Sequence, residues 1–74
     1  MATVHITGWR GGLKKVSHTQ LLHEMAGLSL REAKDVTDAV LDGRAATVAV
    51  ESKAVAEELV TKLHEIGADA SIGE

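Results

Sequence analysis

Apolar and polar residues alternate at three places along the chain, and this pattern predicts three short β-strands. In the first, Val4 and Ile6 are separated by polar neighbours, which is typical of a strand with one buried face. A Gly-rich run at residues 8–12 is expected to end this strand. The predicted strands span residues 3–7, 46–50 and 69–72, with His5, Thr7, Thr47 and Ser71 facing solvent.

The segment after the first strand carries apolar residues at helical spacing and is expected to end at Gly27, which suits a left-handed C-terminal position. Its start has two interpretations. Either Lys14 or Lys15 begins the helix, or Ser17 and Gln20 form a capping box. The expected buried stripe comprises Leu21, Leu22 and Met25, and Val16 and His18 would extend it.

Two further helices follow from cap signals. Ser29 and Glu32 form a capping box, so a helix is expected from Leu30 to about Leu41, and it closes a tight hairpin with the preceding helix. Ser52 is expected to cap the third helix. The inward positions predicted for these helices are Leu30, Ala33, Val36, Val40 and Leu41, then Val55, Ala56, Leu59, Val60, Leu63 and Ile66, with Gly43 and Gly67 as the stops.

These elements predict an α+β fold with the order strand, helix, helix, strand, helix, strand. Short strands with one apolar face need a single covering layer, so we expect a two-layer sandwich in which three helices cover one face of a three-stranded sheet. The sequence contains no proline, internal repeat or linker, and residues 1–74 are interpreted as one domain.

Composition narrows the classes of function. The net charge is −3, and residues 1–23 contain only three lysines and arginines and no acid, which is too little positive charge for a DNA-binding surface. Cysteine is absent, which suits a reducing compartment, and no apolar run is long enough to cross a membrane. We therefore expect a cytoplasmic protein that binds neither DNA nor membranes.

Residues 27–36 read Gly-Leu-Ser-Leu-Arg-Glu-Ala-Lys-Asp-Val. This run resembles the C-terminal domain of the bacterial ribosomal stalk protein, which has Gly-Leu-Gly-Leu-Lys-Glu-Ala-Lys-Asp-Leu there. The resemblance extends upstream to Lys15 and Val16 and downstream through residues 54–68, and so covers nearly all of the chain. It implies the same α+β fold and a helical surface that recruits translational GTPase factors to the ribosome.

The resemblance also implies partner-binding residues. The family's factor-contacting pattern is Lys-Val-Ala-Val-Ile-Lys-x-Val-Arg, and this chain keeps its first two residues as Lys15 and Val16. The positions of the apolar Ile, the second Lys and the Arg are held by Thr19, Gln20 and His23, so two formal charges are lost. Cations of the second helix are kept as Arg31 and Lys34.

These substitutions and a second departure, in the architecture, leave an alternative open. The stalk protein has an N-terminal dimerisation segment and a hinge, whereas this chain starts almost at its first strand, as a free-standing relative would. The alternative function is a free-standing adaptor or regulatory domain of the same fold with no role in translation. The adaptor of the Clp protease shares the fold superfamily, but its amino-end pocket needs an Asn-Asp pair and a His where Gly8, Trp9 and Val40 stand here.

No pattern in the sequence favours catalysis or a cofactor. His18 and His23 are five residues apart, which is off the spacing of a helical metal site. Residues 8–12 lack the Gly-Lys-Ser/Thr ending of a phosphate-binding loop. We therefore expect no enzyme activity, no cofactor and no metal.

Trp9, the sole aromatic residue, has two interpretations. It would either close the open end of an aliphatic core or, together with Arg10, form an exposed anchor for a partner. Contiguity of Trp9 and Arg10 with Lys15 and His23 would favour the second. The sequence leaves the oligomeric state undetermined.

Overall fold

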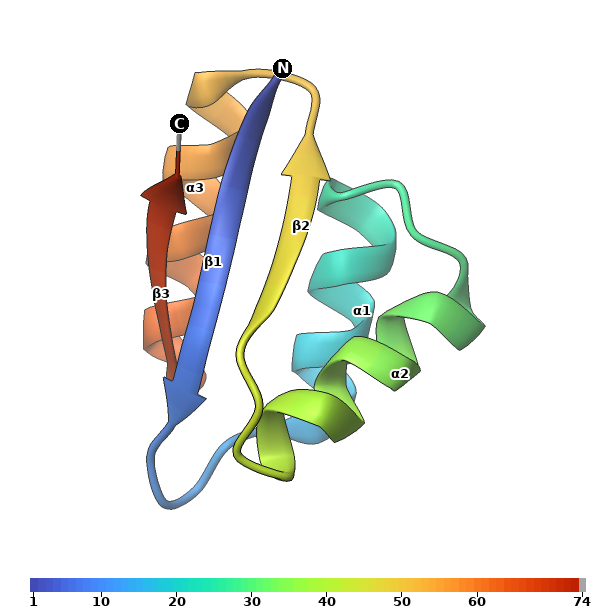
Figure 1. Ribbon diagram of the computed structural model, residues 1–74, viewed down its shortest axis with the longest axis vertical. Coiled ribbons are helices and arrows are strands. Elements are labelled where there is room, and N and C mark those ends of the chain that lie inside the picture. The colour runs from blue at the N-terminus through green and yellow to red at the C-terminus, as the bar shows by residue number, and fades with distance from the viewer. Residues whose placement is uncertain (74) are drawn as a thin grey trace.

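The computed structural model describes residues 1–73, and its element order confirms the predicted strand-helix-helix-strand-helix-strand arrangement (Figure 1). The N-terminal end of β1 and the C-terminal end of β3 lie at the same end of the sheet as the start of α3 (Figure 1). The elements are β1 (Ala2–Trp9), α1 (Lys15–Met25), α2 (Leu30–Leu41), β2 (Ala46–Val50), α3 (Lys53–Glu65) and β3 (Ala68–Gly73).

The three strands form one antiparallel sheet in the order β2-β1-β3. The central strand is thus the first in sequence, and Ile6 pairs with Ala46 on one side and Ala70 on the other. Since β1 supplies both ladders, its side chains occupy the middle of the sheet. Both Val4 and Ile6 are fully buried there, as their alternation predicts.

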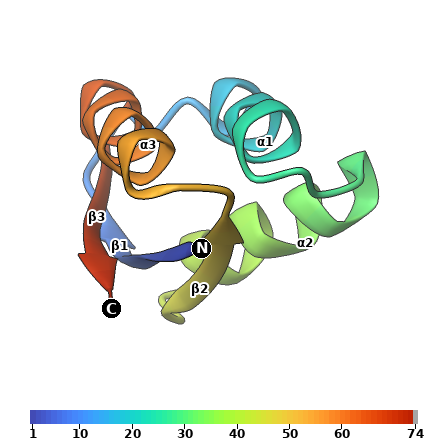
Figure 2. The same ribbon diagram turned by 90° about the horizontal axis from the view of Figure 1, so that it is seen from above.

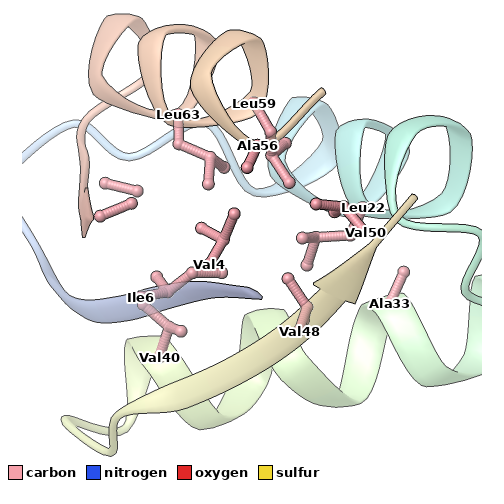
Figure 3. Packing of buried hydrophobic residues seen from close by; sticks show 12 residues of the cluster. Val4, Ile6, Leu22, Ala33, Val40, Val48, Val50, Ala56, Leu59 and Leu63 are labelled. Carbon is pink, nitrogen blue, oxygen red and sulfur yellow. The ribbon is translucent and has the colours of Figure 1, made fainter. Parts of the chain in front are cut away.

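One face of the sheet carries the core and the other is uncovered. Helix α3 packs over β3 and β1, α2 packs against β1 and β2, and α1 packs against the two other helices (Figure 2). Side chains of all three helices meet the strand residues in a single aliphatic cluster (Figure 3). Of the residues predicted to face solvent, Thr7, Thr47 and Ser71 are exposed and His5 is half-buried, with its Nδ1 2.9 Å from Thr47 Oγ1.

The first strand is longer than predicted. The expectation that residues 8–12 end it is wrong for Gly8 and Trp9, which pair with Asp69 and Ala68. A register shift between Ile6 and Gly8 adds one residue to β1, and such a bulge lets a strand continue through a glycine. The ladder therefore holds Trp9 in the sheet, and the turn begins only after it.

The start of α1 resolves the two interpretations. The helix begins at Lys15, so a cap at Ser17 is wrong, and no side chain caps its N-terminus. Backbone hydrogen bonds from Arg10 and Lys14 to the carbonyls of Gly67 and Ile66 fix this start. These bonds reach the distant end of α3, so no local sequence signal carries them.

Candidate protein-binding groove

An open groove of about 340 Å³ lies between α1 and α2. This volume is at the lower end of the range for small-molecule pockets, and the groove is bordered by exposed side chains rather than enclosed. Such a shape suits a few side chains of a protein partner. The residues that line the groove are Lys15, Val16, Thr19, Gln20, Leu30, Lys34, Thr37 and Asp38.

Two exposed aliphatic side chains form the apolar part of the groove. Val16 is 72% exposed and Leu30 is 58% exposed. Their expected places in the buried stripes are therefore wrong. The N-terminal end of α2 projects beyond the edge of the sheet (Figures 1 and 2), and Leu30 is the first residue of this helix. Large apolar side chains exposed together are a common mark of interaction surfaces.

Charged side chains border this apolar part. Lys15 and Lys34 stand on opposite helices, and Asp38 is the one acidic residue among those lining the groove. Arg31 does not line it, but its helical spacing places it beside Lys34 on the exposed rim. Cations outnumber the acid, so the groove favours an acidic partner.

The floor of the groove is a hydrogen-bonded network that joins the two helices. Thr37 donates to the carbonyl of Ala33 at 3.0 Å. The same hydroxyl oxygen lies 2.7 Å from His18 Nδ1 and 2.9 Å from Thr19 Oγ1. His18 is completely buried and Thr37 is 2% exposed. Burial disfavours the imidazolium and lowers the pKa of His18 below its ordinary value.

The remaining predicted residues do not gather at the groove. The Trp9 indole is 41% exposed and donates to the carbonyl of Leu41 at 3.2 Å, so it lies at the C-terminal end of α2. Arg10 forms an exposed ion pair with Asp69 at 3.3 Å. His23 donates from Nδ1 to the carbonyl of Leu28 at 2.7 Å and closes the turn between α1 and α2.

These positions show whether the side chains of Trp9, Arg10, Lys15 and His23 lie side by side. Lys15 and His23 are eight residues apart on one helix, or about 12 Å along its axis at the usual helical rise. Trp9 and Arg10 contact α2 and β3 instead. The four side chains therefore form no single surface, and this arrangement does not support an anchor centred on Trp9.

Sequence reasoning missed three residues that line the groove: Leu30 as an exposed side chain, Thr37 and Asp38. A signal for Thr37 was available. It lies four residues after Ala33 and three before Val40, which places a polar side chain on the buried stripe of α2. The facing stripe of α1 holds His18, so the two polar residues could have been paired.

Other parts of the described chain show weaker evidence of a functional site. A larger hollow of about 550 Å³ lies at the end of the sheet beside Met1, Thr3 and Lys53, and it contains none of the predicted site residues. No three His, Asp or Glu side chains converge within residues 1–73 to hold a metal. No helix in this part of the chain is long and apolar enough to cross a membrane.

Comparison with known proteins gives two similar relatives. The chain is 41% identical over 70 residues to the large ribosomal subunit protein bL12 of Paraburkholderia phytofirmans (strain DSM 17436 / LMG 22146 / PsJN). It is 41% identical over 70 residues to bL12 of Paraburkholderia xenovorans (strain LB400) as well. Each match covers 95% of this chain and 52% of the relative. No protein-family model matches the chain.

The matched region is the C-terminal part of bL12. The chain resembles the C-terminal domain of the bacterial ribosomal stalk protein. It is thus a ribosomal-protein-like α+β domain, and it spans about half the length of the curated relatives that it matches.

The α1–α2 groove combines residues that match the pattern quoted in the sequence analysis with residues that differ from it. Lys15, Val16 and Lys34 retain the family's residue types and line the groove. Thr19 and Gln20 line it too and replace an Ile and a Lys. Two lysines and one apolar residue of the pattern are therefore kept, while one cation and one apolar residue have become polar.

Proposed function

We propose that this chain is a non-catalytic protein-binding module whose α1–α2 groove receives an acidic segment of a translational GTPase factor or of the ribosome. The observation that carries this proposal is the pair of exposed aliphatic side chains, Val16 and Leu30, held between Lys15 and Lys34. The resemblance to the stalk C-terminal domain supports translation as the setting. Residues 1–74 would act as one module in the cytoplasm, where ribosomes work.

The apolar residues and the cations have different parts in this proposal. Val16 and Leu30 would lose their exposed surface on binding, which contributes about 25 cal/mol per Å² of apolar area buried. Lys15 and Lys34 would attract an acidic partner and set its orientation, an effect seen mainly in the association rate. The apolar pair is thus expected to set mainly the dissociation rate, and the two lysines are expected to set mainly the association rate.

The alternative is an adaptor or regulatory module that binds a partner outside translation. Its support comes from the groove itself, because Thr19 and Gln20 replace an apolar and a cationic residue of the factor-contacting pattern. A polar floor and a weaker positive border change which partner side chains the groove binds well. Specificity is the difference between the binding free energies of two partners, so such a change can favour a different partner.

A calorimetric titration of the chain against a purified bacterial translational GTPase factor tests the proposal. Lys15→Glu combined with Lys34→Glu should weaken binding by about tenfold or more, since both rim cations become acidic. Lys53→Glu is the matched control, because Lys53 is an exposed lysine of α3 outside the groove. Equal affinities for the double variant and the control would overturn the proposed groove.

Affinity capture from a bacterial lysate separates the two functions. Recovery of ribosomes or GTPase factors by the original chain, and its loss with the double lysine variant, is expected for the translational function. Lysine-dependent recovery of a different protein, with no ribosomes or factors, would favour the alternative. The identity of the captured partner therefore decides between them.

A further inference from the structure

His18 and Thr37 connect α1 to α2 through a hydrogen bond between His18 Nδ1 and Thr37 Oγ1, and its direction follows from the single hydrogen of the hydroxyl group. The single hydroxyl hydrogen of Thr37 is donated to the carbonyl of Ala33. The oxygen of Thr37 must then accept from His18 Nδ1, so Nδ1 carries the ring hydrogen. The neutral imidazole therefore has an unprotonated Nε2.

That second nitrogen is buried and has no hydrogen-bond partner among residues 1–73. Protonation would turn Nε2 into a donor without an acceptor and would place a positive charge in the protein interior. Both changes are costly, because a buried donor needs a partner and a buried charge needs a counter-ion. The packing around His18 thus accepts the neutral ring and disfavours the imidazolium.

The charged groups on the helices around His18 stand at exposed or partly exposed rims. None of them is hydrogen-bonded to the ring, and burial alone accounts for the lowered pKa of His18. A protonated ring would therefore find no paired carboxylate. The charged groups of these helices that line the hollows beside α1 are Lys15 and Glu24 on α1, Lys34 and Asp38 on α2, and Glu58, Lys62 and Glu65 on α3.

We propose that His18 is a proton-dependent lock on the α1–α2 pair: the neutral ring fits the buried site between the helices, and its protonation loosens the pair beneath the groove because Nε2–H has no acceptor there and the charge has no counter-ion. The bond from Nδ1 to Thr37 is kept in the protonated ring, and Thr37 lines the groove, so a displacement of the charged ring reaches a groove residue directly. Regulation of partner binding rests on the proposed function, whereas the lock belongs to the free chain.

The direction of the pH effect follows from the lowered pKa. Above the ordinary value of 6.5, both the folded and the unfolded chain hold a neutral His18. As the pH falls below it, the unfolded chain takes up a proton before the folded chain does. The folding equilibrium constant therefore falls as the pH decreases from 6.5 to the lowered pKa of the folded state. For one proton the decrease is at most about tenfold per pH unit.

The first test compares the unfolding equilibrium of the original chain with His18→Asn between about pH 7.5 and 5, on either side of the reference value. The Asn amide reproduces a donor near Nδ1 but does not titrate. The folding equilibrium constant of the original chain should fall relative to the variant by up to about tenfold per pH unit. His5→Asn is the matched control, because His5 Nδ1 also meets a threonine hydroxyl but on the exposed face. Parallel pH profiles for the original chain and His18→Asn would overturn the lock.

A nuclear magnetic resonance titration of the free original chain gives a second reading that needs no variant to fold. Amide shifts of Val16 and Lys34 should change together with the His18 ring, while those of Ala49 on the uncovered sheet face stay constant. A His18 ring that titrates at or above its ordinary value, or groove amides that ignore it, would contradict the lock. Since no partner is present, a chain that shows this coupling but binds no factor would retain the lock and lose the proposed function.

Discussion

Gly67 joins α3 to β3 in a conformation that side chains resist. Its φ is +99°, and a Cβ placed on it would lie 3.3 Å from the Cα of Leu13. The loop before α1 is held at the same point, because Arg10 donates its backbone N–H to the Gly67 carbonyl at 2.8 Å. This glycine therefore combines a left-handed backbone with close packing against the loop that leads into α1.

Gly67→Ala is expected to lower the free energy of unfolding by about 1–2 kcal/mol, the usual cost of a left-handed conformation for a residue with a Cβ. Gly11→Ala is the control, since Gly11 has no positive φ and no atom within 4 Å of an added Cβ. Chemical denaturation of both variants measures the difference. Equal stabilities would contradict the role assigned to Gly67.

Residue positions were predictable from the sequence where burial follows a regular spacing. Val4, Ile6 and Leu22 are buried as their patterns indicate. Leu30 is exposed despite its place on the stripe, because spacing records the face of a helix and not whether another element covers that turn. Likewise, Thr37 shows that a buried position can hold a polar side chain when a partner such as His18 is available across the helix pair.

Among the elements, α2 carries the strongest local signals. Ser29 accepts from the Glu32 N–H at 3.1 Å, and its own N–H donates to the Glu32 carboxylate at 3.0 Å. The bond from the Ser29 backbone, followed by that from its hydroxyl, lowers the pKa of Glu32. This reciprocal cap fixes the start of α2, and Leu30, the first residue of that helix, lines the groove.

Ser29→Ala should therefore cost about 1 kcal/mol of stability, the typical value for a lost N-cap. The lowered pKa of Glu32 means that its contribution is present above the ordinary carboxyl pKa and is lost as the pH falls through the lowered value. Ser29→Ala keeps the backbone N–H that is the larger cause of the lowered pKa of Glu32, so the titrating group is removed separately with Glu32→Gln. The Gln variant should be less sensitive to acid in that window because its side chain does not titrate. Ser52→Ala is the comparison, because Ser52 caps Val55 of α3 without a reciprocal carboxylate.

Thermal unfolding of Glu32→Gln and of both serine variants at several acidic pH values checks this prediction. A Glu32→Gln profile that runs parallel to that of the original chain would contradict the reciprocal cap. Local signals of this kind also explain which element boundaries could be predicted. The bounds of α2 were obtained from Ser29 and Leu41, whereas the start of α1 depends on a backbone bond from Lys14 to Ile66, far along the chain.

At the scale of the whole molecule, the groove is separate from the main core. Helix α1 packs on α2 and α3 rather than directly on the sheet (Figure 2), and all residues that line the groove belong to α1 and α2. The element order was predictable, but the strand order β2-β1-β3 and the groove depend on contacts between distant segments. The resemblance to the stalk domain identified Lys15, Val16, Thr19, Gln20 and Lys34, and the structure brings these five together.

This separation predicts that binding and stability can be changed independently. Val16→Ala combined with Leu30→Ala should change the free energy of unfolding little, by about 0.5 kcal/mol per site or less, because both side chains are exposed. Leu22→Ala in the core should cost about 2–5 kcal/mol. Denaturation of the two variants measures the contrast, and a large loss for the groove variant would show that the groove is part of the core.

The most direct test of the binding groove is a map of amide chemical shifts for the labelled chain during titration with the GTPase domain of a bacterial translation factor. We expect saturable changes centred on Val16, Thr19, Leu30 and Lys34, and the changes should disappear in the Val16→Ala/Leu30→Ala variant while its fold persists. Saturable changes centred instead on the uncovered sheet face, around His5 and Thr47, would contradict the assignment of the α1–α2 groove as the binding surface.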